Sequence, residues 1–195
     1  MRKGLLKQAG YSMIELMLVT GIMGVVTGIA VVQIGSSKQG LVGDGAMRVV
    51  LSQLNQAKQL AITQRRNMRL TFANNNSVQI IREEVPGPTL TTISTVPFEG
   101  GMQFLRIGAL PDLTTAPLTE VPANPAGVAL AFAGATQIRF APDGTLVDEN
   151  GNTLNGTVFL AHVATEVMSA RALTIFGATG RVRAFRWDGS SWKVV

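Results

Sequence analysis

Cysteine is absent from this chain of 195 residues, and histidine occurs once, as His162. Without cysteine no disulfide can form, so an apolar core must hold the fold together. One histidine cannot supply a zinc site, and no second base is at hand for a Ser-His-Asp or Cys-His set. A single histidine between apolar neighbours in a strand ordinarily has a structural role. We therefore expect no enzymatic activity, no cofactor and no small-molecule substrate.

Charged residues are also scarce, at 15% of the chain, and residues 16–34 contain none. This run, LMLVTGIMGVVTGIAVVQI, is close in length to the roughly 20 residues that a bilayer-spanning helix needs. A secretory signal peptide has a shorter apolar segment, of about 7–15 residues, followed by a small-x-small cleavage site. The Gly-Ser-Ser-Lys at 35–38 is a poor site of that kind. The run therefore predicts a single-pass membrane helix.

Three of the basic residues, Arg2, Lys3 and Lys7, precede this run, and the remaining chain carries 14 basic and 12 acidic side chains. The formal net charge of +5 is thus weak evidence for a nucleic-acid partner. Lysine and arginine beside a membrane helix tend to stay in the cytoplasm. The flank predicts a cytoplasmic N-terminus and an exported C-terminal domain.

Glu15 immediately precedes the apolar run of residues 16–34. An acidic residue near the middle of a membrane helix costs about 2.5–3.5 kcal/mol on insertion scales, and less near the interface. A plain membrane anchor explains the length of the run but not this carboxylate. Glu15 therefore needs either a charged partner or contact with the lipid headgroups.

A basic leader at 1–10, the pair Gly10-Tyr11, Glu15 as the fifth residue after the glycine, and the long apolar run follow one another in order. This arrangement resembles the type III signal of type IV pilin-like proteins. The resemblance implies that a prepilin peptidase cuts after Gly10 and methylates the new amine of Tyr11. It further implies a bacterial inner-membrane protein, with a periplasmic domain, that assembles with other pilins into a filament. There the cationic amine of Tyr11 would pair with Glu15 of a neighbouring subunit in low dielectric, which would fix the axial register.

The helical pattern resumes after a soft, glycine-rich break between Gly35 and Gly45. Apolar residues at three- and four-residue spacing predict an amphipathic helix over about 46–66 that packs on a sheet. They are Met47, Val50, Leu51, Leu54, Ala57, Ala61 and Ile62. Residues 11–35 and 36–67 would form one long helix whose middle can bend or unwind. Gly24 and Gly28 have the spacing that lets helices approach closely in a membrane or filament.

From residue 68 onward the apolar period becomes two, which predicts short antiparallel strands. The expected strands are 68–72, 77–81, 137–141, 145–148, 152–154, 157–163, 171–176, 181–187 and 192–195. Seven of the eight prolines fall within 86–127, so this part is predicted as long loops with at most one strand near 102–107. The expected fold class is α+β, a long N-terminal helix packed on an antiparallel β-sheet domain at 68–195.

Three further segments carry a narrower resemblance: residues 52–72, 138–146 (IRFAPDGTL) and 178–185 (ATGRVRAF). They resemble the GspH/FimT group, which contains minor pseudopilins of type II secretion and minor pilins of type IV pili. The resemblance implies a pilin-like fold and a subunit that initiates or caps a pseudopilus or pilus. The chain lacks the proline near Val32 that often kinks the first helix of major pilins, so any bend depends on glycine.

Arg181 and Arg183 would lie on one face of a strand, together with Phe185 and Trp187, while Arg186 points the other way. Guanidinium groups beside aromatic rings can bind phosphates and stack on bases. In some FimT-like pilins a G-R-x-R motif at this place is associated with DNA capture, so a DNA-binding minor pilin is the alternative function. The other interpretation is a solvated strand protected by charge.

Residues 148–152, Asp-Glu-Asn-Gly-Asn, have oxygen-bearing side chains in a row. The alternation of a calcium-binding loop, D-x-[DN]-x-[DN]-G, is not present. The segment therefore predicts a turn, and a calcium site is the alternative.

Overall fold

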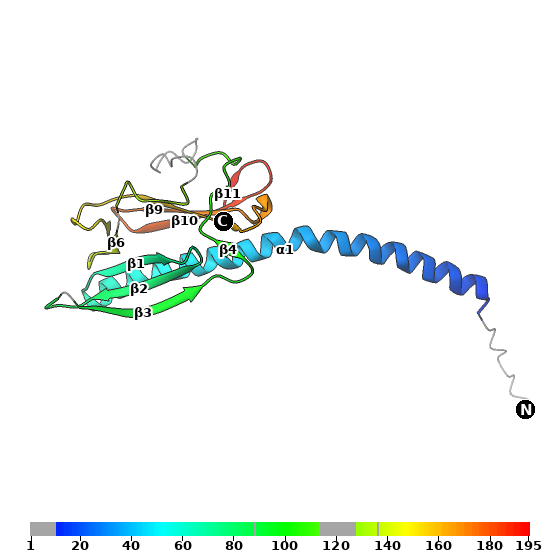
Figure 1. Cartoon of the computed structure of the whole chain (residues 1–195), viewed down its shortest axis with the longest axis horizontal. Coiled ribbons are helices and arrows are strands. Elements are labelled where there is room, and N and C mark those ends of the chain that lie inside the picture. The colour runs from blue at the N-terminus through cyan, green and yellow to red at the C-terminus, as the bar shows by residue number, and fades with distance from the viewer. Residues whose placement is uncertain (1–10, 88, 114–127, 136) are drawn as a thin grey trace, which may run out of the picture. The chain divides into compact units, whose positions relative to one another are not determined.

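The computed structural model describes residues 11–87, 89–113, 128–135 and 137–195, and within these the side chains of 32–37 are not described (Figure 1). The chain divides into two compact units, Met1–Lys38 and Gln39–Val195, which are treated separately below. The leader and Gly10 lie outside the described residues.

Helix α1 (Met13–Gln64) has 52 residues and is the one α-helix of the described chain. It begins after Ser12, whose carbonyl oxygen accepts hydrogen bonds from the amides of Glu15 and Leu16 at 3.0 and 3.2 Å. The single long helix is confirmed. The glycine-rich range 35–45 does not interrupt α1, which is helical throughout it.

The second half of α1 packs into the core through one face. Its buried residues recur at the predicted spacing: Ala46, Met47, Val50, Leu54, Ala57 and Ala61. Leu51 is half-buried and Ile62 is 39% exposed, so they mark the edges of the stripe. The buried stripe belongs to the main apolar cluster, which takes residues from both sheets described next.

Two antiparallel sheets complete the folded unit (Figure 1). The first has the order β3-β2-β1-β6-β7, and the second β11-β10-β9-β8-β4, with β5 also paired to β8. The strands are β1 (Met68–Ala73), β2 (Ser77–Glu83), β3 (Leu90–Pro97), β4 (Met102–Gln103), β5 (Leu130–Ala131), β6 (Ile138–Phe140), β7 (Leu146–Val147), β8 (Gly156–His162), β9 (Arg171–Phe176), β10 (Arg181–Trp187) and β11 (Trp192–Val194). The antiparallel β domain is therefore confirmed.

Asparagine and glycine occupy positive-φ positions in turns between strands. Asn74 and Asn75 adopt positive φ values of 51° and 56° between β1 and β2, a conformation that asparagine tolerates. Gly144 has φ of 85° in the turn between β6 and β7, and Gly151 has φ of 87° after β7. The chain reverses at Asn-Asn-Asn, Pro-Asp-Gly and Glu-Asn-Gly, and the last of these lies in the turn predicted at 148–152.

The proline-rich stretch contains more structure than predicted. Strand β3 lies within the range expected to form loops, where only a strand near 102–107 was foreseen and β4 covers two residues of it. Its sequence, LTTISTVP, is rich in β-branched residues, which favour strands. Proline is compatible with its last position because β3 is an edge strand, with β2 as its neighbour in the sheet.

A second apolar layer covers the outer face of the second sheet. Phe159 of β8 and Phe185 of β10 are 3% and 1% exposed and pack with Leu113 and Trp192. Trp187 lies in a neighbouring cluster with Ile107 and Leu110 from the loop before residue 114. The guanidinium of Arg106 lies 5.5 Å from the centre of the Phe159 ring. This layer hides the aromatic side chains of β10.

Candidate functional site

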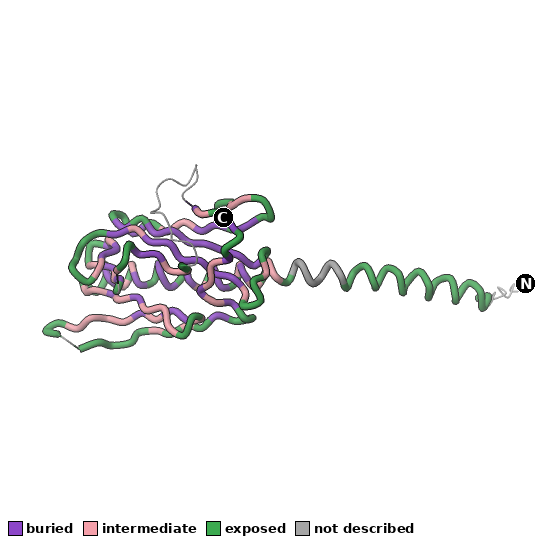
Figure 2. Tube along the Cα trace, turned by 45° about the horizontal axis from the view of Figure 1, so that its top comes forward, coloured by how far each residue is buried: buried purple, intermediate pink, exposed green. Residues whose placement is uncertain are grey.

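The first unit exposes an apolar surface that needs a partner. Met13–Val31 is long and apolar enough to cross a membrane, with a mean hydropathy of 2.1 and none of its window buried. Figure 2 shows this part of α1 as exposed along its length. Added Cβ atoms at Gly21, Gly24 and Gly28 would meet nothing within 4 Å, so the glycine positions are open to a second helix. Contiguous apolar surface of this size marks a membrane or protein contact.

Glu15 lies in the first turn of α1, and Tyr11 just before it is 81% exposed. The first amides of a helix carry a partial positive charge, which favours a carboxylate at this end. Tyr11 and Glu15 are thus both presented on the surface at the N-terminal end of the apolar segment. Gly10, the predicted cleavage position, lies outside the described residues.

The strand β10 holds Arg181 and Arg183, which pair with Phe176 and Thr174 of β9. Arg181 is exposed and Arg183 half-buried. They alternate with Val182 and Ala184, which pack against the main core. The predicted common face of the two arginines therefore agrees with the alternation of burial along the strand.

The aromatic half of that prediction fails. Phe185 and Trp187 are only 1% and 6% exposed, because the second apolar layer covers them. They cannot stack on nucleic-acid bases. Gly180, which precedes the arginines, has φ of 58°, and an added Cβ would lie 2.3 Å from the carbonyl oxygen of Gly144. The glycine of the G-R-x-R motif is thus required by a close turn-to-turn contact.

Two other candidate groups, Asp148 and His162, accept hydrogen bonds from backbone amides of nearby residues. The Asp148 carboxylate accepts hydrogen bonds from the amides of Asn150 and Asn152 at 2.9 and 2.7 Å, as expected for a turn. His162 Nδ1 accepts the amide of Ala164 at 3.1 Å and lies 3.7 Å from the Glu166 carboxylate. Among the described residues, no three His, Cys, Asp or Glu side chains are grouped to hold a metal ion.

The GspH model, described as type II transport protein GspH, matches residues 46–180, more than half of the chain. The chain belongs to the GspH family. The predicted resemblance to this family is therefore confirmed. The match extends from the buried half of α1 to the turn before β10, so Tyr11, Glu15, Arg181 and Arg183 lie outside the matched range.

Solved structures add a distant likeness. The crystal structure of the type IV minor pilin FimU from Pseudomonas aeruginosa (strain PAO1) is 14% identical, with a TM-score of 0.48. The match covers 77% of this chain and 91% of the FimU chain. This likeness is too distant to bear on function. No curated protein matches the sequence.

One ionic contact in this chain was not predicted from the sequence. The side chain of Arg171 on β9 is completely buried, and its Nε donates a 2.7 Å hydrogen bond to Asp44 of α1. Its Nη1 donates to the carbonyl oxygens of Met168 and Ala170 at 2.9 and 2.8 Å, and its Nη2 to that of Gly40 at 2.7 Å. A buried guanidinium needs such a full set of acceptors. These hydrogen bonds and the ion pair join α1 to β9 of the second sheet.

Gly43 lies beside this contact, and its replacement tests how closely α1 packs against the segment before β9. An added Cβ at Gly43 would lie 2.5 Å from the carbonyl oxygen of Ser169, whereas at Gly45 it would meet nothing within 4 Å. Alanine is favoured over glycine in a helix by about 0.5–1 kcal/mol. We expect Gly45→Ala to stabilise the folded unit by about that amount and Gly43→Ala to destabilise it, as measured by chemical denaturation. Equal effects of the two changes would contradict this close approach.

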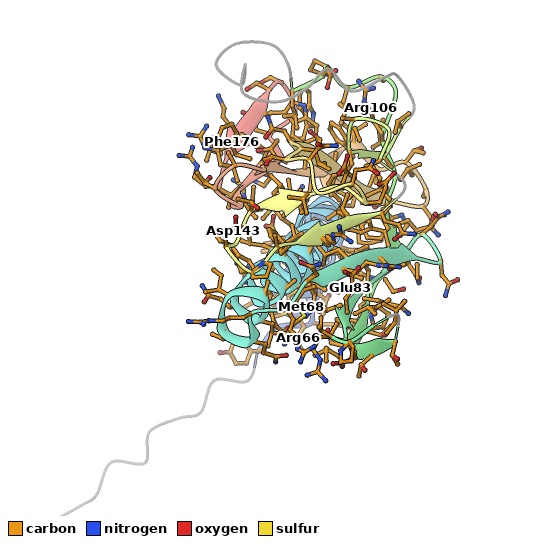
Figure 3. The ribbon with its side chains drawn as sticks, turned by 90° about the vertical axis from the view of Figure 1, so that its left-hand side faces the viewer. Arg66, Met68, Glu83, Arg106, Asp143 and Phe176 are labelled. Atoms are coloured by element: carbon orange, nitrogen blue, oxygen red, sulfur yellow. The ribbon has the colours of Figure 1, made fainter. Side chains whose placement is uncertain are left out.

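A carboxylate on the first sheet makes stability depend on pH. Glu83 accepts hydrogen bonds from Arg69 at 2.9 Å and Asn67 at 3.1 Å, and Arg139 lies 3.3 Å away (Figure 3 labels Glu83). Burial alone would raise the pKa of Glu83, but the Arg69 and Asn67 hydrogen bonds and the Arg139 charge outweigh it and lower the pKa.

Because the pKa of Glu83 is lower in the folded protein than the unfolded value of 4.5, the ionised carboxylate stabilises the fold above pH 4.5. This stabilisation is lost as the pH falls through the folded-state pKa. Glu83→Gln should therefore flatten the fall in stability below that pH. The measurement is the urea midpoint at a series of pH values. Parallel curves for the two proteins would show that Glu83 does not contribute to acid sensitivity.

Proposed function

We propose that this GspH-family chain is a minor pilin or pseudopilin that helps initiate or cap a type II secretion pseudopilus or a type IV pilus. It is made as a single-pass protein of the bacterial inner membrane, with its N-terminus in the cytoplasm and the folded unit in the periplasm. A prepilin peptidase cuts after Gly10 and methylates Tyr11. Its other partners are neighbouring pilins or pseudopilins in the filament.

One observation carries the proposal: the apolar segment Met13–Val31 is fully exposed and begins with a carboxylate in its first turn. A plain membrane anchor does not need the Glu15 carboxylate, whereas in a filament subunit it can pair with the cationic amine of a neighbouring Tyr11. Cleavage creates a cationic amine at Tyr11, and an opposite charge is strongly favoured where the dielectric is low. The small residues Gly24 and Gly28 suit close packing of such helices in a filament core.

The experiment is mass spectrometry of the intact protein purified from its own cells. The expected mass is that of a chain beginning at Tyr11 and carrying one added methyl group. A chain that begins at Met1 would contradict the proposal and leave a membrane-anchored β domain in its place.

The second candidate is a DNA-binding minor pilin that acts in natural transformation. The observation in its favour is that Arg181 and Arg183 share one face of β10, with Arg181 exposed. Because Phe185 and Trp187 are buried, contact would be with phosphates rather than bases. Such binding is independent of sequence and weakens as salt rises.

A gel-shift titration of the full chain in detergent tests this candidate. Arg181→Ala with Arg183→Ala should abolish binding, while Arg186→Ala, on the opposite face of the same strand, should preserve it. Equal binding by the double variant and the unchanged protein would remove the DNA-binding candidate and leave the structural one.

A further inference from the structure

Exposed apolar side chains gather where α1 enters the folded unit. Leu41, Val163, Val167 and Met168 are 71%, 55%, 40% and 41% exposed, and we call these four residues the apolar collar. They come from α1 and from the segment between β8 and β9 that contains the short 3-10 helix Val167–Ser169.

The two segments of the collar are in direct contact. Gly43 lies against the carbonyl oxygen of Ser169, and Arg171 joins the carbonyl oxygens of Gly40 and Met168 through its two Nη atoms. Figure 1 shows the same arrangement, with the orange segment before β9 beside α1. The collar is therefore a fixed surface of the folded unit, since the buried Arg171 holds both of its segments.

The apolar surface continues from Leu41 into a groove of about 470 Å³. Its lining includes Val42, Ala46 and Val49 of α1 and Val96 and Pro97 at the end of β3. Val42 is close to the loop after β3, because an added Cβ at Gly100 would lie 2.6 Å from its Cγ1. The apolar surface thus extends from Leu41 to the end of β3.

The charged groups near the collar do not favour a nucleic acid. Glu166 lies within the β8–β9 segment at 3.7 Å from His162, and Glu99 lines the groove. Asp44 is already bound by Arg171, with Arg186 at 3.9 Å. An occupant with apolar groups fits this surface better than a polyanion.

The length of chain between the collar and the membrane segment identifies the occupant. Leu41 follows Ile34, the last residue of the uncharged apolar run, by seven residues. Seven residues span about 10 Å as a helix and about 25 Å when fully extended. A collar tethered this closely to an inserted helix has a high effective concentration at the bilayer surface. A few apolar side chains then suffice for binding, because the helix is a first anchor and the collar only a second one.

We propose that the apolar collar binds the surface of the lipid bilayer and docks the folded unit on the membrane before the subunit enters a filament. The inference rests on the proposed function, because it requires Met13–Val31 to lie in the membrane. Leucine, valine and methionine enter the boundary between headgroups and acyl chains, and Glu166 stays in the aqueous headgroup layer.

The chain has no cysteine, so a single introduced cysteine gives an unambiguous label. Val167→Cys in the full chain is labelled with an environment-sensitive nitrobenzoxadiazole dye and placed as one copy in each phosphatidylcholine nanodisc. The matched control is Phe176→Cys, which is equally exposed at 40% but lies at the other end of β9. Met17→Cys, inside the apolar segment, reports on membrane insertion.

Docking predicts a blue shift of the dye at Val167 and loss of its emission when lipids with a nitroxide on the acyl chain are introduced. The dye at Phe176 should show neither change. Quenching at Met17 without quenching at Val167 overturns the inference and leaves the proposed function intact. Absence of quenching at Met17 contradicts membrane insertion, and with it the proposed function. A change at Val167 that appears only with two copies per nanodisc also overturns the inference, because the collar would then bind a second subunit.

Discussion

Replacing Asp44 by alanine is expected to lower the free energy of unfolding of the folded unit by about 3–5 kcal/mol, the usual cost of breaking a buried ion pair from one side. The cost is large because the Arg171 side chain has no exposed surface and would keep its charge without a carboxylate beside it. Tryptophan fluorescence during chemical denaturation of the full chain in detergent measures the effect, since Trp187 is buried in this unit.

Arg186→Ala is the matched control for this change. Arg186 also approaches Asp44, but at 3.9 Å and with half of its side chain exposed. Exposed ion pairs contribute about 0–1 kcal/mol, so this variant should unfold almost as the unchanged protein does. Should Asp44→Ala cost no more than Arg186→Ala, the contact between α1 and β9 would not stabilise the fold.

Replacing Glu15 by alanine should prevent incorporation into filaments while insertion and cleavage continue. In a filament the Tyr11 amine would be buried without its counter-charge, at a cost of about 3–5 kcal/mol per contact. That corresponds to a loss of affinity of roughly 10²–10⁴-fold. The measurement is the ratio of protein recovered in isolated filaments to protein left in the membrane.

Glu15→Asp separates the effect of losing the negative charge from the effect of changing the side-chain length. It keeps the carboxylate on a side chain shorter by one methylene, so incorporation should fall less than with alanine. Processed Glu15→Ala protein that enters filaments as efficiently as the unchanged protein would show that the carboxylate only contacts lipid headgroups.

The sequence predicted those elements whose local pattern agrees with their final surroundings. The buried stripe of α1 was recognised because every third to fourth residue faces a core. Strands β8 and β9 are buried on both faces, and they were recognised as short apolar segments bounded by turn residues. Strand β3 was missed because prolines at both of its ends suggested loops, although an edge strand tolerates them.

Other features depend on residues far apart in the chain. Arg171 and Asp44 are separated by 127 positions, and no periodicity links them. The one available signal was that Asp44 is the only acidic residue between Glu15 and Glu83. The close approach of Gly43 to Ser169 likewise joins residues far apart in the chain. The burial of Phe185 and Trp187 depends on residues of the loop before residue 114, which no strand pattern places over them.

Arg171 also determines where a pulling force would enter the folded unit. It joins α1 at Gly40 and Asp44 to β9, a strand with hydrogen-bonded neighbours on both sides. Tension along the N-terminal part of α1 would therefore reach the interior of the second sheet at this first point of attachment. The apolar contacts farther along the helix would be shielded from the load.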